Sequence, residues 1–137
     1  MSLVLDASVT LAWTFTDERN AAADVVLDRV LAEGATVPSL WKLEVANALR
    51  SAVRRGRCDE AFVDRTLADL EELTIALDGE TDARAWTDTR RLSREEGLTL
   101  YDAAYLELAL RSNGPLASAD SALIGAARRR GLDVLAA

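Results

Sequence analysis

The stretch Leu3-Val4-Leu5-Asp6-Ala7-Ser8 (LVLDAS) decides the fold. Three consecutive apolar residues run directly into a carboxylate and then into two small residues. A strand that is apolar on both faces is typical of a parallel sheet covered by helices on each side. In such sheets the functional groups lie just beyond the carboxyl ends of the strands, which makes Asp6 a candidate site residue. The alternative is that Asp6 only caps the turn that follows, a common role for aspartate.

The rest of the chain alternates helical and strand-like segments. Apolar residues at helical spacing, with glycine or asparagine near the ends, predict helices over 18–33, 39–55 (capped by Ser39), 59–73, 80–96, 99–112 and 120–130. Short apolar runs predict strands at 35–37, 73–77, 115–118 and 132–135, the last at a sheet edge. The apolar segment 9–15 is expected to turn over the sheet edge. Strands separated by helices predict a parallel α/β sandwich, built as one domain over residues 1–137.

Composition narrows the possible chemistry. Half of the 137 residues are apolar, enough for a real core, and no apolar run approaches the length of a membrane span. The aromatic side chains are expected to lie mostly in the core: Trp13, Phe15, Trp41, Phe62 and Trp86. A single cysteine, Cys58, rules out an internal disulfide framework and indicates a cytoplasmic protein.

The chain contains no histidine. Serine–histidine and cysteine–histidine nucleophile systems, histidine acid–base nucleases and nearly all zinc sites are therefore excluded. Any metal must be a hard ion held by oxygen, such as Mg²⁺ or Mn²⁺.

The net charge of −7 argues against a protein that binds nucleic acid by non-specific electrostatic attraction. It allows a protein that binds a phosphate group through metal ions. The positive charge is almost all arginine, in clusters at 50–57 and 128–130. Such clusters at helix ends are explained by the helix dipole, at about 0.3–1 kcal/mol for each charge, and this interpretation is favoured for 128–130. For the first cluster a track for a phosphate backbone stays open, with Arg50 and Arg54 as candidate contacts.

Four acidic residues are candidates for a shared site. Asp6 ends the first strand, and Glu44 lies in a long helix whose polar stripe continues through Asn47. Asp102 lies in the first turn of a helix, and Asp120 directly precedes another. Each has a structural alternative, because Thr99-x-x-Asp102 has capping-box spacing, Asp120 is a good N-cap, and Glu44 fits a solvated face. Three of the four nevertheless fall at the strand ends and helix starts where α/β folds place their sites.

A cluster of these acids would need cations. Two carboxylates about 5 Å apart repel by about 3 kcal/mol at an effective dielectric constant of about 20. Several such pairs would rival the stability of a whole domain, about 5–15 kcal/mol. The site must therefore take up protons, spread apart or bind metal ions, and one or two Mg²⁺ ions would neutralise it and generate a nucleophile for attack on a phosphodiester.

Four blocks of sequence resemble the PIN-domain ribonucleases and, more narrowly, the VapC toxins of bacterial toxin–antitoxin pairs. They are, in the order of that family, LVLDASVTLAW (3–13), VPSLWKLEVANALR (37–50), LTLYDAAYLELAL (98–110) and PLASADSALIGAARRRGLDVL (115–135). Segment 59–96 carries no diagnostic motif, and the fourth block has Ala-Ser-Ala-Asp where a threonine before the acid is more usual.

The resemblance implies a PIN-like three-layer α/β/α sandwich whose five-stranded parallel sheet has the first strand at its centre. It implies an Mg²⁺- or Mn²⁺-dependent endoribonuclease with Asp6, Glu44, Asp102 and Asp120 as the acidic site, supported by Ser8 and Ser118. Asp6 and Asp102 are the expected direct ligands and Asp120 completes the shell. Glu44 binds a second ion or orients the nucleophile. The resemblance also implies a cognate antitoxin that inhibits the toxin, and a homodimer.

Other α/β families lack their motifs in this chain. There is neither G-x-G-x-x-G after the first strand nor G-x-x-x-x-G-K-[ST], so dinucleotide-binding and P-loop folds have no phosphate cradle. Phosphorelay receiver domains need a lysine late in the chain, and no lysine follows Lys42. Haloacid-dehalogenase-type phosphatases need Asp-x-Asp after the first strand, where this chain has Asp6-Ala7-Ser8. The alternative that stays open is a catalytically idle PIN-like module that binds RNA or protein.

Overall fold

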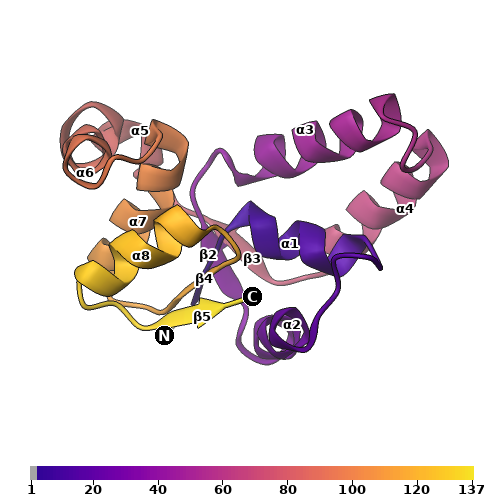
Figure 1. The fold of residues 1–137 in the computed structure, drawn as a ribbon, viewed down its shortest axis with the longest axis horizontal. Coiled ribbons are helices and arrows are strands. Elements are labelled where there is room, and N and C mark those ends of the chain that lie inside the picture. The colour runs from indigo at the N-terminus through magenta and orange to yellow at the C-terminus, as the bar shows by residue number, and fades with distance from the viewer. Residues whose placement is uncertain (1–2) are drawn as a thin grey trace.

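The computed structural model describes residues 3–137, which form a five-stranded sheet flanked by helices (Figure 1). The strands β1 (Leu3–Leu5), β2 (Ala35–Val37), β3 (Ile75–Leu77), β4 (Leu116–Ser118) and β5 (Val134–Ala136) are arranged in the order β3-β2-β1-β4-β5. All four pairings are parallel. The predicted PIN-like α/β architecture is thus confirmed, with β1 at the centre and β5 at an edge.

The helices follow the predicted order with small shifts of their ends. They are α1 (Ala7–Thr14), α2 (Ala21–Glu33), α3 (Trp41–Arg54), α4 (Glu60–Glu71), α5 (Thr81–Arg84), a π-helical turn η1 (Ala85–Thr89), α6 (Arg90–Glu96), α7 (Leu100–Ser112) and α8 (Ser121–Arg129). The apolar β1 is fully buried, and so are Leu49 of α3 and Leu106 of α7. This burial of apolar side chains on both faces of the central strand is what the opening sequence predicts.

Three local expectations were wrong. Segment 9–15 does not turn over the sheet edge, because it belongs largely to α1. Ser39 does not cap α3, because the N-cap of that helix is Leu40. The backbone N–H of Ser39 instead donates to the Thr81 hydroxyl at 3.0 Å. The helix expected over 80–96 does form, with the π-helical turn η1 between α5 and α6. Trp86, which lies in η1, is 87% exposed rather than part of the core.

Gly34 lets β2 begin close to the chain that enters the edge strand β3. It ends α2 with a φ of +78°, a backbone conformation that favours glycine, and a Cβ atom built there would lie 2.9 Å from the Thr74 carbonyl oxygen. The next residue, Ala35, donates its backbone N–H to the same carbonyl at 3.0 Å. Glycine at this position therefore allows β2 to begin directly beside the chain that enters β3.

An ion-pair network holds α7 against the end of β3. Arg111 donates to both carboxylate oxygens of Asp78, at 3.0 and 2.6 Å, and to both of Glu107, at 2.9 and 3.0 Å. The Asp78 side chain is 9% exposed and the Glu107 side chain 6%. Since α7 begins with the segment that carries Asp102, this network fixes one helix of the candidate site.

Candidate active site

Asp6 leaves the centre of the sheet and is held by two hydroxyl groups. It is 5% exposed, and its Oδ2 accepts hydrogen bonds from Ser8 at 2.7 Å and from Ser118 at 2.8 Å. Ser118 is the last residue of β4, which pairs with β1, so two neighbouring strand ends meet at this carboxylate. Ser8 and Ser118 therefore both contact the carboxylate of Asp6.

Asp120 and Asp102 begin the helices that follow, and the expected capping contacts form around both. The Asp120 carboxylate accepts a hydrogen bond from the backbone N–H of Leu123 at 3.0 Å and so caps α8. The Thr99 hydroxyl caps α7 by accepting from the Asp102 N–H at 3.1 Å. Helix capping, the structural alternative for these two segments, is therefore observed. It does not prevent the two carboxylates from also belonging to the candidate site.

Glu44 is on α3 and is half-buried. Its Oε1 accepts a hydrogen bond of 2.5 Å from the hydroxyl of Tyr105, a residue of α7 that is fully buried. The sequence reasoning missed Tyr105. The available signal was its position three residues after Asp102, which places both on one side of α7.

The carboxylates influence one another electrostatically. Burial raises the pKa of Asp6, and the charge of Asp120 adds to this, although the two serine hydroxyls oppose it. Burial also raises the pKa of Glu44, with the charges of Asp6 and Asp102 adding to the effect. Burial again dominates for Asp102, whose pKa is raised further by Asp120 and Asp6. The four acids picked from the sequence therefore share one electrostatic environment.

The donor set fits a hard divalent cation, although the acids do not form a closed cage. Among residues 3–137, no three His, Cys, Asp or Glu side chains are grouped closely enough to hold a metal ion as they stand. The acids offer only oxygen donors, and three of them have raised pKa values. Mg²⁺ and Mn²⁺ prefer oxygen ligands and keep several waters, so they do not require an all-protein cage.

The remaining candidate residues lie outside the acid cluster. Asn47 is exposed and lines a shallow hollow with Leu40, Leu43, Glu44 and Tyr101, so it borders the site on the α3 side. Arg50 and Arg54 are exposed further along the same helix.

In the second arginine cluster, Arg129 and Arg130 form ion pairs with Glu96 at 2.8 Å each. This pairing agrees with a structural role for that cluster.

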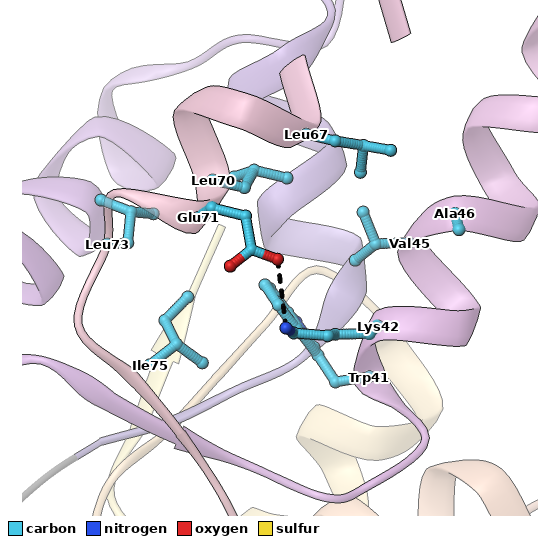
Figure 2. A pocket seen from close by; sticks show the side chains of 9 residues that line it. All are labelled: Trp41, Lys42, Val45, Ala46, Leu67, Leu70, Glu71, Leu73 and Ile75. Atoms are coloured by element: carbon cyan, nitrogen blue, oxygen red, sulfur yellow. Dashed lines mark hydrogen bonds and ion pairs between the residues drawn. The ribbon is translucent and has the colours of Figure 1, made fainter. Parts of the chain in front are cut away.

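An apolar groove lies on another side of α3, between α3 and α4. Figure 2 shows its lining, which includes Trp41, Val45, Leu70 and Ile75. Lys42 reaches across it to Glu71 with an ion pair of 3.1 Å. Helix α3 thus separates the acidic site from an apolar groove.

No helix within residues 3–137 combines the length and the apolar character that crossing a membrane would require.

Comparisons with known proteins identify the family. The family model for the PIN domain matches residues 3–129. Ribonuclease VapC3 of Pyrobaculum aerophilum is 34% identical over 123 residues, which cover 90% of this chain and 92% of that protein.

Solved structures have the same fold. PAE2754 from Pyrobaculum aerophilum superposes with a TM-score of 0.71 at 25% identity, covering 98% of this chain and 90% of that one. VapBC2 from Rickettsia felis, solved bound to a DNA fragment from its promoter, superposes with a TM-score of 0.63 at 15% identity, covering 98% and 97%. The resemblance predicted from the sequence is confirmed, and the chain belongs to the PIN-domain family as a VapC-type member.

Proposed function

We propose that this protein is a metal-dependent endoribonuclease that hydrolyses RNA phosphodiester bonds and acts as the toxin of a toxin–antitoxin pair. The observation that carries the proposal is the convergence of Asp6, Glu44, Asp102 and Asp120 in one electrostatic environment without an arginine or lysine among the groups that shift their pKa values. Family membership adds independent support. An idle binding module has no use for carboxylates that repel one another.

Each acidic residue has a proposed role in metal binding. Asp6 and Asp102 are the proposed direct ligands of Mg²⁺ or Mn²⁺, Asp120 completes the shell, and Glu44 binds a second ion or orients the attacking water. When bound, the metal would activate water and stabilise the negative charge that develops on the phosphate. Ser8 and Ser118 hold the Asp6 carboxylate in one orientation, as their hydrogen bonds to Oδ2 indicate.

The products of cleavage test this chemistry. Direct attack of water on phosphorus leaves a 5′-phosphate and a 3′-hydroxyl, whereas attack by the 2′-hydroxyl leaves a 2′,3′-cyclic phosphate. Since the chain has no histidine, the second route lacks its usual general base. We expect 5′-phosphate ends, loss of cleavage in EDTA, and recovery with Mg²⁺ or Mn²⁺. Cyclic phosphate ends, or cleavage that persists in EDTA, would contradict the proposal.

The exposed arginines of α3 are proposed to contact the RNA backbone. Arg50 and Arg54 lie on the same helix as Glu44, separated from it by roughly two to three helical turns. Replacing both with glutamine should weaken RNA binding and reduce its salt dependence, while the Mg²⁺ affinity stays unchanged. Binding that is unaltered across salt concentrations would remove both residues from the interface.

A cognate antitoxin is the proposed regulator. An acidic site attracts a cation, so the antitoxin is expected to present an Arg or Lys near Asp6 and Asp102 while its apolar residues enter the groove between α3 and α4. The exposed Ala46 lines this groove, and Ala46→Glu should weaken antitoxin binding without loss of cleavage. Ala61→Glu, at an exposed position on α4 that does not line the groove, is the matched control. A complex whose site stays open and still cleaves RNA would contradict this mode of inhibition.

A homodimer acting in the cytoplasm completes the proposal. Leu43 and Tyr101, which are 76% and 64% exposed, line one hollow beside Glu44 and provide apolar surface for a second copy. Leu43→Asp should yield a monomer by light scattering, and Leu31→Asp, at another exposed apolar position, should not. A Leu43→Asp protein that stays dimeric would move the interface elsewhere.

A further inference from the structure

The hydroxyl group of Tyr105 lies where three elements of the site meet. Tyr105 is on α7, three residues after Asp102, and its side chain is fully buried. Its hydroxyl donates to Oε1 of Glu44 on α3. The backbone of Ala7, the residue that follows Asp6 and begins α1, lies close enough to the same hydroxyl to oppose the rise in its pKa that burial and the Glu44 charge cause. The Tyr105 hydroxyl therefore lies between the segments that carry Asp6, Glu44 and Asp102.

This contact is directional. A phenol has one proton to donate, and Tyr105 gives it to a carboxylate that lies 61 residues away in the sequence. A glutamate side chain has three rotatable bonds, and an unrestrained Glu44 would lose conformational freedom when it engaged an ion or a water molecule. Because the phenol holds Oε1, Glu44 already loses this conformational freedom when the protein folds. Its second oxygen, Oε2, then keeps a fixed direction.

We propose that Tyr105 is a positioning residue, which orients the Glu44 carboxylate toward the other acids and so sets the affinity of the site for a divalent cation. The inference rests on the proposed function, since it assumes that Glu44 serves a metal ion or the water beside it. Tyr105 itself has no contact with RNA in this role, because its side chain is fully buried.

The test compares Tyr105→Phe with the wild type. This substitution keeps the ring and removes only the hydroxyl. Groups that orient metal ligands typically change metal affinity by about 10–100-fold. We expect the Mg²⁺ dissociation constant from calorimetry to rise by about 10-fold, and kcat to fall while the KM for RNA stays unchanged. Ser112→Ala, which removes a hydroxyl from the last residue of the same helix, should leave the Mg²⁺ affinity unchanged.

A double-mutant cycle separates positioning from packing. If Tyr105 acts through Glu44, Tyr105→Phe should have no further effect on Mg²⁺ affinity in the Glu44→Ala background. An equal loss in both backgrounds, or a loss of less than twofold in the wild type, would overturn the proposal. So would a Tyr105→Phe protein that is unfolded in EDTA, because the hydroxyl would then serve the core.

The wild type separates this inference from the proposed function. A wild type that neither binds Mg²⁺ nor cleaves RNA would refute the proposed function. A wild type that does both, beside a Tyr105→Phe protein that behaves identically, would refute only the role of Tyr105.

Discussion

Asp6 and Asp78 occupy equivalent positions in the fold but have opposite surroundings. Each directly follows a strand of the parallel sheet, Asp6 after β1 and Asp78 after β3, so both lie at the carboxyl edge. The hydrogen bond from Arg111 holds the pKa of Asp78 below its ordinary value. Burial raises the pKa of Asp6, and the neighbouring charge it feels is that of another carboxylate, Asp120.

This difference separates a structural acid from a functional one. A buried carboxylate with a bidentate arginine is satisfied, and it helps to hold α7 in place. Buried carboxylates that shift one another's pKa values upward are strained until a cation or proton arrives. The arrangement costs stability, and it agrees with the proposal that this site binds a metal ion.

The largest effect on stability should come from removing the arginine. Arg111→Met would leave Asp78 without its arginine and Glu107 with only Arg84, at 3.8 Å, and breaking a buried pair costs about 3 kcal/mol or more. Urea unfolding should show this loss, and Asp78→Asn in the same chain should restore part of it. Arg65→Met, at an exposed position in the middle of α4, should change little. If Arg111→Met proved as stable as the wild type, the contrast between the two acids would lose its energetic basis.

Asp102→Asn should act in the opposite direction on stability. It removes one repelling charge and keeps the side-chain shape, so the metal-free variant should be no less stable than wild type, and more stable by about 1 kcal/mol. Cleavage should fall by more than about 100-fold, the upper range for the loss of an outer-shell group. The rise in Tm that millimolar Mg²⁺ gives the wild type should largely disappear.

Thermal melts in EDTA and in Mg²⁺, beside one cleavage assay, test the Asp102 prediction. Asp69→Asn removes the same charge from an exposed position on α4 and serves as the control. A variant of Asp102 that melts well below wild type, yet responds to Mg²⁺ and cuts RNA, would assign this residue to helix capping alone.

The smallest predicted effect is a pH dependence with two opposite parts. Because the pKa values of Asp6, Glu44 and Asp102 are raised, the folded metal-free protein binds protons more tightly than the unfolded chain does. These groups therefore stabilise the protein as the pH falls through their folded pKa values, and that contribution is lost as the pH rises through them.

Asp78 has the opposite dependence. Its lowered pKa contributes stability above the ordinary value of 3.8, and this is lost as the pH falls through the folded pKa. In EDTA, the Tm of the wild type should rise as the pH falls from neutrality toward the ordinary carboxyl pKa values of 3.8 and 4.5, and Mg²⁺ should raise it less at the lower pH because protons compete for the carboxylates. In Asp102→Asn the rise should be smaller. A wild-type Tm that falls steadily over this range would contradict the raised pKa values.

The order of the elements was predictable because each helix carries apolar residues at its own period and ends at a clear stop such as Gly34. Segment 9–15 was misassigned because it is too short and too uniformly apolar to show a helical period. Trp86 was misassigned because it lies in a π-helical turn, whose spacing departs from the 3.6 residues that any helical pattern assumes.

The acids themselves were identifiable because strand ends and helix starts can be located from sequence. The contacts of Tyr105 and Arg111 were not, because each joins residues far apart in the chain: Tyr105 to Glu44 across 61 residues and Arg111 to Asp78 across 33. No local pattern records which side chains a fold brings together over such distances. The same limit explains why Asp6 and Asp78 look alike in the sequence.

The hydrogen bond between Ser118 and Asp6 spans 112 residues, and β1 pairs directly with β4. During synthesis at about 5–20 residues per second, Asp6 leaves the ribosome roughly ten seconds before the segment that completes its surroundings. A nascent chain therefore carries Asp6 without the Ser118 hydroxyl that holds its carboxylate. Because the first strand pairs with β4, the centre of the sheet can be completed only when translation of the domain is nearly finished.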